Sequence, residues 1–319
     1  MDGGVARGLR ELVSTPMHGL FDHSLLVVTG KGGVGKSTVA AALGLAASAR
    51  GLRTIVVEVA AREDVSRALA SNVAGVYAER ALDERLHHIS IDPQRAMEEY
   101  LRQALPLGAL AALLSRSRIF TTLIAAAPGM RELLTMGKVW ELAQHERRVR
   151  DAEPYDLVVL DAPATGHGLA MLQAPRTFAT VARVGPVAGQ GRAIADFLVD
   201  PRRTAVLAVS TAEEMPVTET LQLRSQLGQQ SGLDLSLVVV NAVVPHRFSA
   251  ADERTLRAAP RSPARHAALF AATWTRQQHA QITRLRQSLP GVALVTLPFV
   301  FRSALDRAAL ELLAGKFEQ

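Results

Sequence analysis

Cysteine is absent from the 319-residue sequence, and aromatic residues make up only 4% of it. Without thiols the chain can form neither a disulfide framework nor a thiolate zinc site, and it has no cysteine nucleophile. The lack of disulfides fits a reducing cytoplasm, where we expect the protein to reside. Because 48% of the residues are hydrophobic and few of these are aromatic, we predict a core of aliphatic side chains.

An apolar run long enough to cross a membrane is also absent. The uncharged runs, such as 103–115 and 119–130, fall short of the roughly 18–20 apolar residues that a spanning helix needs. Residues 1–23 are interrupted by charges and have no continuous apolar core, so they do not resemble a signal peptide. We therefore predict a soluble protein with an N-terminal extension, 1–24, and one domain, 25–319.

The net charge of +6 and the isoelectric point near 10.2 would suit an anionic partner, either nucleic acid or anionic lipid. The positive residues are nevertheless scattered arginines rather than a run with interleaved aromatics. We interpret most of them as solvated helix faces and do not expect nucleic acid as a partner.

Six short apolar runs alternate with helical stretches, which predicts an α/β fold with a mostly parallel sheet flanked by helices. The runs are continuous, as expected for strands covered on both faces. They are residues 25–29, 54–59, 157–160, 205–209, 235–241 and 292–297. A helix over 36–50 should follow the first run and end at Gly51. Two further segments should also be helical, an insertion at about 92–150 with a break at 127–129 and a polar segment at about 245–290.

The run GKGGVGKST at residues 30–38 matches the P-loop pattern Gly-x-x-x-x-Gly-Lys-Ser between a buried strand and a helix. Binding a phosphate requires backbone N–H groups that converge on the anion, and Gly32, Gly33 and Gly35 allow this through positive φ and close approach. The start of the helix adds partial positive charge. The expected nucleotide-binding residues are Gly30, Lys31, Gly32, Gly33, Val34, Gly35, Lys36, Ser37 and Thr38. Lys36 should pair with the β- and γ-phosphates, Ser37 should bind Mg²⁺, and Thr38 should reach the α-phosphate.

A lysine directly after the first glycine makes this loop unusual. Gly-Lys-Gly-Gly-x-Gly-Lys resembles the deviant P-loop of the partition, nitrogenase-iron-protein and arsenite-pump ATPases. The resemblance implies that Lys31 reaches across a dimer to the partner's nucleotide, so that ATP binding and dimerisation are linked. The alternative is that Lys31 is only a solvated loop residue.

A second motif, DAPATGH at residues 161–167, places Asp161 at the carboxyl end of a buried run, where open α/β sheets bind ligands. A carboxylate there can hold Mg²⁺, usually through water. The stretch resembles the second switch of the arsenite-pump ATPase (ArsA) family, which includes the guided-entry ATPase for tail-anchored membrane proteins. His167 is then a residue of the switch or simply a packed loop histidine. The resemblance extends over about 25–313, with Asn241 at the position of the adenine-reading Asn and Pro298 in the loop that closes over the base.

Two departures from the family limit what the resemblance implies. The absence of cysteine removes both the metalloid-binding thiols of arsenite pumps and the zinc clamp of the eukaryotic targeting ATPases. In addition, Ala60 stands where the first switch of the family has an Asp that orients and deprotonates the attacking water. The carboxylate that remains is Glu58, which lies two residues earlier and should share the same strand face, and a weaker candidate is Asp64 in the following turn. Loss of a water-positioning group typically slows hydrolysis by a factor of about 10²–10⁴.

The sequence therefore predicts a dimeric, ATP-hydrolysing ArsA-like ATPase that uses ATP and Mg²⁺, with Lys31, Lys36, Glu58 and Asp161 as catalytic residues and Ser37 and Asp161 as metal ligands. The dimer is a homodimer or a heterodimer with a paralogue that retains the Asp. The apolar stretch at 101–136 suggests a groove for a hydrophobic client, although such a stretch can equally be ordinary core. A second hypothesis is a weakly hydrolysing or non-hydrolysing regulatory subunit. A third is a partition-type ATPase that binds DNA through the arginines at 254, 257, 261 and 265.

Overall fold

The computed structural model of the chain describes residues 19–60, 62–69, 77–104, 129–149, 152–181, 186–302 and 304–318. The strands are β1 Leu25–Gly30, β2 Thr54–Val59, β3 Arg80–Ala81, β4 Leu86–Ile91, β5 Leu157–Asp161, β6 Thr204–Thr211, β7 Leu235–Val243 and β8 Ala293–Pro298. The helices are η1 Leu20–Asp22, α2 Lys36–Ala49, α3 Asp64–Leu69, α4 Pro93–Ala104, α7 Met130–Leu142, α8 Thr165–Val181, α9 Pro186–Val199, α10 Glu214–Ser231, α11 Ala250–Ala258, α12 Pro263–Ser288 and α13 Arg307–Ala314.

The eight strands form one sheet in the order β3-β4-β2-β5-β1-β6-β7-β8, with β1 between β5 and β6. All neighbouring pairs are parallel except β3 and β4 at one edge. Parallel strands of this kind need crossover connections, and here the helices supply them. As a result the carboxyl ends of β1, β2, β5, β7 and β8 lie along the same side of the sheet, which is where such folds bind ligands.

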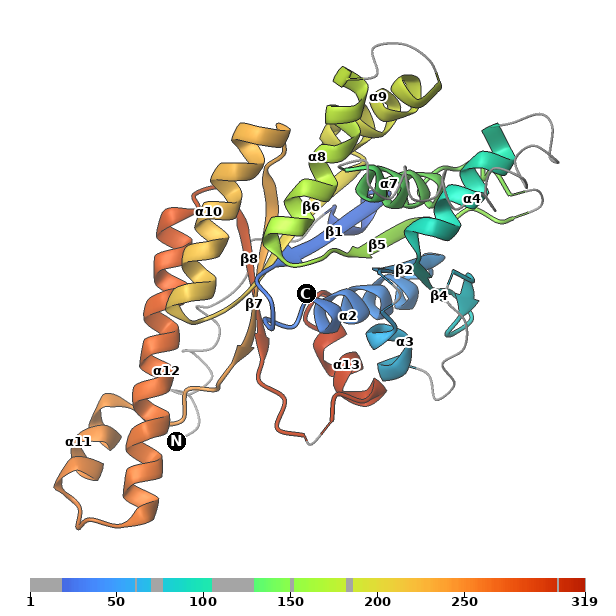
Figure 1. Ribbon diagram of the computed structural model, residues 1–319. Helices are drawn as coiled ribbons and strands as arrows, with labels where there is room; N and C mark the ends of the chain where they lie inside the picture. The colour runs from blue at the N-terminus through green and yellow to red at the C-terminus, as the bar shows by residue number, and fades with distance from the viewer. Residues whose placement is uncertain are drawn as a thin grey trace.

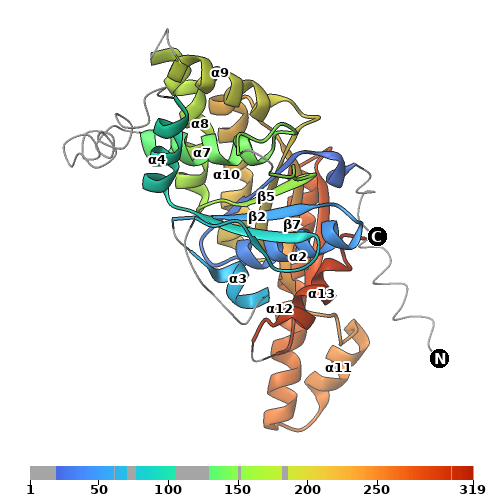
Figure 2. The ribbon, with the colours of Figure 1, turned by 90° about the vertical axis from the view of Figure 1, so that its right-hand side faces the viewer.

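Helices cover both faces of the sheet (Figure 1). The helices α2, α3 and α13 pack on one face through a core that includes Leu26, Val39, Leu43 and Leu313. On the other face α7, α8, α10 and α12 enclose a second core that includes Val27, Leu160 and Met136. The strands between these cores are buried throughout, which explains their continuous apolar sequences. The α11–α12 hairpin projects beyond the sheet in both views (Figures 1 and 2).

The sheet confirms the predicted fold class, and each of the six predicted runs lies in a strand to within a few residues. The prediction missed β4, because His87 and His88 interrupt its apolar pattern and the segment precedes a long helical stretch. Helices α4 and α7 lie in the predicted insertion, and α11 and α12 lie in the second helical segment. The stretch 105–128, which includes most of the predicted client groove, falls outside the described residues. The division into an N-terminal extension and one domain stays a prediction.

Helix α2 ends one residue earlier than predicted, with Arg50 at its C-cap and Gly51 in the left-handed region at φ 84°. Within the described ranges no helix combines the length and the apolar character that crossing a bilayer requires.

Candidate active site

The phosphate loop connects the end of β1 to the start of α2, and its glycines are required by the backbone. Gly30, Gly33 and Gly35 have φ values of 144°, 85° and 90°. A Cβ on Gly30 would lie 2.2 Å from the backbone oxygen of Val209, so the loop can leave the sheet only at a glycine. Gly32 does not have the positive φ that we expected. At Gly32 and Gly33 an added Cβ would meet nothing within 4 Å, so open space lies in front of this turn.

The start of α2 is suited to an anion because its own capping is incomplete. The N-cap residue is Gly35, and no side chain accepts a hydrogen bond from the first turn. Unpaired N–H groups and the helix dipole then leave partial positive charge at this end. Lys36 is buried and its ammonium donates to the backbone oxygen of Lys31 at 3.0 Å. Burial lowers the pKa of Lys36, while the nearby Asp161 opposes the shift and Arg62 adds to it. An anion in the loop would favour the charged lysine.

Asp161 ends β5 beside the phosphate loop and is fully buried. Its Oδ2 accepts a hydrogen bond of 2.6 Å from the Ser37 hydroxyl, across 124 residues of sequence. Its Oδ1 is among the buried oxygens of the described residues that have no hydrogen-bond partner. Burial raises the pKa of Asp161, against the lowering effects of Ser37, Arg62 and Lys36. Such a buried, incompletely paired carboxylate is stabilised by a cation.

The donor set at Ser37 and Asp161 fits Mg²⁺. One hydroxyl and one carboxylate, with an unpaired oxygen between the strand ends, are the hard oxygen ligands that this ion prefers. Among the described residues no group of three or more His, Asp or Glu side chains could hold a metal. A protein site of this kind would leave most of the coordination sphere to water and phosphate, as Mg²⁺ sites usually do.

Two further buried hydroxyls without a partner belong to residues near the ends of β1 and β5. The Oγ1 atoms of Thr29, near the end of β1, and Thr165, at the start of α8, are buried without a hydrogen-bond partner in the described part of the chain. A Cβ on Gly168 would come within 2.9 Å of the Thr29 oxygen, so α8 packs closely against β1 here. His167 lies exposed on the first turn of the same helix.

Glu58 faces the same region, because β2 pairs with β5 so that Glu58 lies beside Asp161. Its carboxylate is fully buried and accepts from the backbone N–H groups of Asp64 at 2.9 Å and Val65 at 3.1 Å. His88 of β4 bonds to the same carboxylate at 2.8 Å. Glu58 thus holds the start of α3 to the sheet. A role as general base would require it to exchange these partners.

Asp64 and Ala60, the other residues of this switch, supply no carboxylate to the site. The Asp64 side chain is half exposed and pairs with Arg67 at 3.4 Å on the surface of α3. Ala60 is exposed and has a left-handed φ of 65°, and its N–H donates to the backbone oxygen of Ile91 at 3.1 Å. A non-glycine residue is uncommon in this region, where Asn and Asp are tolerated best.

Arg62 is a site residue that the sequence did not reveal. Its guanidinium lies 3.5 Å from Asp161 Oδ2, and its Nε donates to the backbone oxygen of Val59 at 3.4 Å. It therefore brings a second positive charge, besides Lys36, to the carboxylate at the end of β5. Only its closeness to Asp161 in the fold identifies Arg62, because a single arginine after a strand is not part of a recognisable sequence motif.

Lys31 is held within its own chain. Its ammonium forms an ion pair with Glu219 of α10, and each side chain is about one-third exposed, at 32% and 31%. The lysine that the resemblance assigns to a partner's nucleotide is thus partly exposed but already paired. The two residues lie 188 positions apart, so the sequence could not predict the contact.

Asn241 and Pro298 lie at the ends of β7 and β8, on the same side of the sheet as the phosphate loop. The Asn241 amide donates to the backbone oxygen of Val34 at 2.9 Å and so connects β7 to the loop. A Cβ on Gly35 would lie 2.2 Å from that amide nitrogen. The structure thus gives Asn241 a position next to the loop, and its predicted contact with a base remains a prediction.

Comparison with known proteins agrees with this arrangement. Residues 23–185 and 180–262 match the family described as anion-transporting ATPase, and together they include both phosphate motifs and Asn241. The chain belongs to this family. Membership makes it an ATPase, with ATP binding and hydrolysis as its class of activity, and confirms the resemblance to the arsenite-pump ATPases.

Individual relatives cover different shares of the chain. It is 32% identical to the ATPase BagA of Mycobacterium tuberculosis over 235 residues, which are 72% of this chain and 67% of that protein. It is 25% identical to an arsenical pump-driving ATPase of Escherichia coli over 294 residues, 85% of this chain but only 46% of the relative. A relative with the same name from Acidiphilium multivorum is 25% identical over 277 residues and is 43% covered. The chain thus spans less than half the length of these two pump-driving ATPases.

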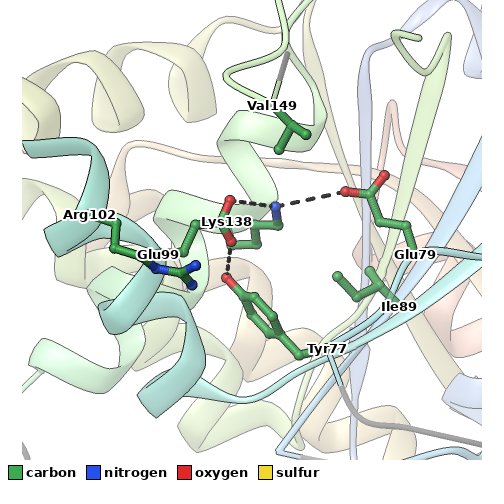
Figure 3. Close-up of a pocket in the computed structure, with 7 residues that line it drawn as sticks. All are labelled: Tyr77, Glu79, Ile89, Glu99, Arg102, Lys138 and Val149. Atoms are coloured by element: carbon green, nitrogen blue, oxygen red, sulfur yellow. Dashed lines mark hydrogen bonds and ion pairs between the residues drawn. The ribbon is translucent and has the colours of Figure 1, made fainter. Parts of the chain in front are cut away.

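A separate polar cavity of about 420 Å³ lies between β4, α4 and α7 (Figure 3). Lys138 enters it from α7 with only 6% of its side chain exposed, and lies 3.0 Å from both Glu99 and Glu141 and 3.8 Å from Glu79. Tyr77 donates to Glu99. Arg147 completes the network by pairing with Glu79 and Glu141.

These ion pairs satisfy one another and connect α7 to α4 and to the edge of the sheet. Burial alone would raise the pKa of Glu141, but hydrogen bonds and charge from Arg147 and Lys138 lower it below the ordinary value. We therefore interpret the residues around the cavity as structural: their ion pairs hold α4, α7 and the edge of the sheet together.

Proposed function

We propose that this chain binds ATP with Mg²⁺ at the carboxyl ends of β1 and β5, and that the bound nucleotide controls a dimer. The observation that carries the proposal is the bond between Ser37 and Asp161, with an unpaired carboxylate oxygen beside the open start of α2. Backbone N–H groups of residues 30–38 would hold the phosphates, and Lys36 would move from the Lys31 carbonyl to their oxygens. Mg²⁺, held by Ser37 and by Asp161 through water, would neutralise phosphate charge.

Hydrolysis also needs a water molecule placed in line with the terminal phosphate. The chain lacks an evident side chain to position and deprotonate that water. Ala60 offers no base, and Glu58 is engaged with α3 and His88. Arg62 is close enough to Asp161 to place positive charge beside the phosphates, which favours the transition state without activating water. We infer that the isolated chain turns over slowly, by the factor of about 10²–10⁴ that a missing positioning group typically costs.

The dimer in this proposal depends on Lys31. The lysine is bound to Glu219 in the single chain, so crossing to a partner's nucleotide would require it to leave this ion pair. The partner is a second copy or a paralogue with an intact carboxylate at the position of Ala60. The name of the pump-driving relatives suggests arsenical transport, but this sequence contains no thiol to bind a metalloid.

One experiment tests the binding site and the dimer together. Wild type, D161N, K31A and the exposed-lysine control K316A would be compared for Mg²⁺-dependent ATP binding, single-turnover hydrolysis and size by light scattering with ATP. We expect D161N to lose the Mg²⁺ dependence, K31A to bind ATP without dimerising, and K316A to behave as wild type. ATP-dependent dimers of K31A would refute the trans role of Lys31. Unchanged Mg²⁺-dependent binding by D161N would refute the site.

The second candidate function, a regulatory ATP-binding subunit, is favoured by Ala60 alone. It predicts ATP-linked association with a paralogue and no measurable turnover by the isolated chain. Appreciable turnover by a homodimer that survives E58Q would exclude both this function and the base role of Glu58.

A further inference from the structure

The positive charge of this protein is concentrated in one part of the fold. Residues 245–302 contain nine arginines and no lysine, against only Asp252 and Glu253, and so carry a net charge of +7. The whole chain carries +6, which leaves the remainder close to neutral. Eight of these arginines precede β8, in the segment that contains the α11–α12 hairpin, and Arg302 follows β8. The hairpin projects from the rest of the molecule (Figures 1 and 2).

The same part of the fold exposes an unusual share of the aromatic residues. Four of the fourteen aromatics in the chain form a continuous row from α12 to the segment after β8. Ring centroids are 6.0 Å apart for Phe270 and Trp274, 6.5 Å for Trp274 and Phe299, and 4.8 Å for Phe299 and Phe301. Phe270 is 68% exposed and Phe301 is 62% exposed, so the row is not a core.

The hairpin that presents these groups is built to be rigid. Ser249 caps α11 in a reciprocal capping box with Asp252, and Ser262 caps α12. Arg265 donates to the backbone oxygens of Leu256 and Arg257 and so ties the two helices together. The exposed arginines and rings thus stand on a fixed scaffold, where their ordering costs little when they bind.

We propose that this surface, residues 247–276 together with 299–302, docks on a bilayer that contains anionic lipid. Arginine charge would attract the headgroups, while the exposed Phe rings and the half-buried Trp274 between them would enter the boundary between headgroups and acyl chains, where aromatic side chains are favoured. The Arg247 guanidinium lies over the Phe301 ring at 5.2 Å and so places charge directly beside the apolar row. The proposal concerns a face separate from the phosphate site and does not depend on ATP hydrolysis.

The geometry of this surface favours a lipid bilayer over two other binding partners, single-stranded nucleic acid and a second copy of the chain. Single-stranded nucleic acid binds on ring faces that are free for stacking, but here neighbouring rings meet at 43°, 67° and 62° and cover one another's faces and edges. A second copy of the same surface would bring two surfaces of net charge +5 together, which is repulsive. An anionic bilayer complements the charge and accepts the apolar rings at the same time.

The intrinsic fluorescence of Trp274 gives a direct test. The sequence contains two tryptophans, so W140F leaves Trp274 as the only reporter. We expect a blue shift and co-sedimentation with vesicles of phosphatidylcholine containing about one-third phosphatidylserine, and neither with pure phosphatidylcholine. R254Q/R261Q should lower the partition coefficient roughly twentyfold, since each charge near such a surface contributes about a factor of five. F270S/F301S should lower it and remove most of the blue shift.

Matched controls are available on other faces. R202Q removes an arginine with 89% of its side chain exposed, and L312S removes an exposed apolar residue of α13. Both should bind vesicles as the W140F parent does, and these variants should keep the melting temperature of that parent, because the residues changed in addition to Trp140 are on the surface. Absence of binding to anionic vesicles would overturn the proposal. So would unchanged binding by F270S/F301S, or an equal blue shift with a single-stranded oligonucleotide that competes with the vesicles.

Discussion

Replacing Ala60 by aspartate adds a carboxylate at the end of β2 and suits the backbone that is already present. Ala60 has a φ of 65°, and the left-handed region costs a residue with a Cβ about 1–2 kcal/mol, with Asp and Asn affected least. The side chain is exposed, so the longer residue has room. We therefore expect A60D and A60N to be as stable as wild type, or more stable by up to about 1 kcal/mol in the free energy of unfolding.

Comparing A60D with A60N distinguishes the effect of the added carboxylate on hydrolysis from the effect of a residue better suited to the left-handed backbone. If the missing carboxylate limits water activation, A60D should raise the single-turnover rate of ATP hydrolysis by about 10²–10⁴-fold, and A60N should leave it near the wild-type value. The measurement is a quenched single-turnover assay with protein in excess over ATP, alongside thermal denaturation of each variant. Equal rates for folded A60D and A60N would refute the reasoning, because they differ in the base and not in the backbone preference.

Three predictions concern stability. K138M should lower the free energy of unfolding by up to about 3–5 kcal/mol, because it removes the buried cation that Glu99 and Glu141 share, although Glu141 keeps its ion pair with Arg147, whereas K316M on the surface should change little in chemical denaturation. The pKa of Glu141 lies below its ordinary value, so its ion pairs stabilise the fold above the unfolded pKa of about 4.3, and that stability should be lost as the pH falls through the lower, folded pKa. K138M should weaken this acid dependence in unfolding curves measured between neutral and acid pH, and an unchanged dependence would contradict it. G30A should lower the melting temperature and abolish ATP binding, since its Cβ would overlap a backbone oxygen, while G32A should keep the melting temperature because its Cβ meets open space.

The sheet and the phosphate loop could be predicted because both leave a local pattern. Strands buried on both faces appear as continuous apolar runs, and the turn at Gly30 needs a residue without a Cβ. Strand β4 left no such pattern, because His88 is buried through its bond to Glu58 rather than through apolar character. A sequence window cannot show that a polar residue has a partner 30 positions away.

The contacts that modify the chemistry of the site were beyond prediction for the same reason. Ion pairs such as Lys31 with Glu219 and Arg62 with Asp161 join segments that only the fold brings together. The sequence identified Glu58 and Asp161 as candidate catalytic carboxylates, but it did not show that one is already bonded to α3 while the other keeps an unpaired oxygen. Which of two similar groups is available for chemistry depends on such partners.

The hydrogen bond from the Ala60 N–H to the Ile91 oxygen has a mechanical consequence. Ile91 ends β4, and α4 begins two residues later at Pro93, so the backbone at the end of β2 is attached almost directly to the root of that helix. Glu58 strengthens the attachment by bonding to His88 on the same strand. Any displacement of residues 58–60 must therefore either break these bonds or move β4 with it. Because α4 begins directly after β4, a movement of that strand would tilt the helix.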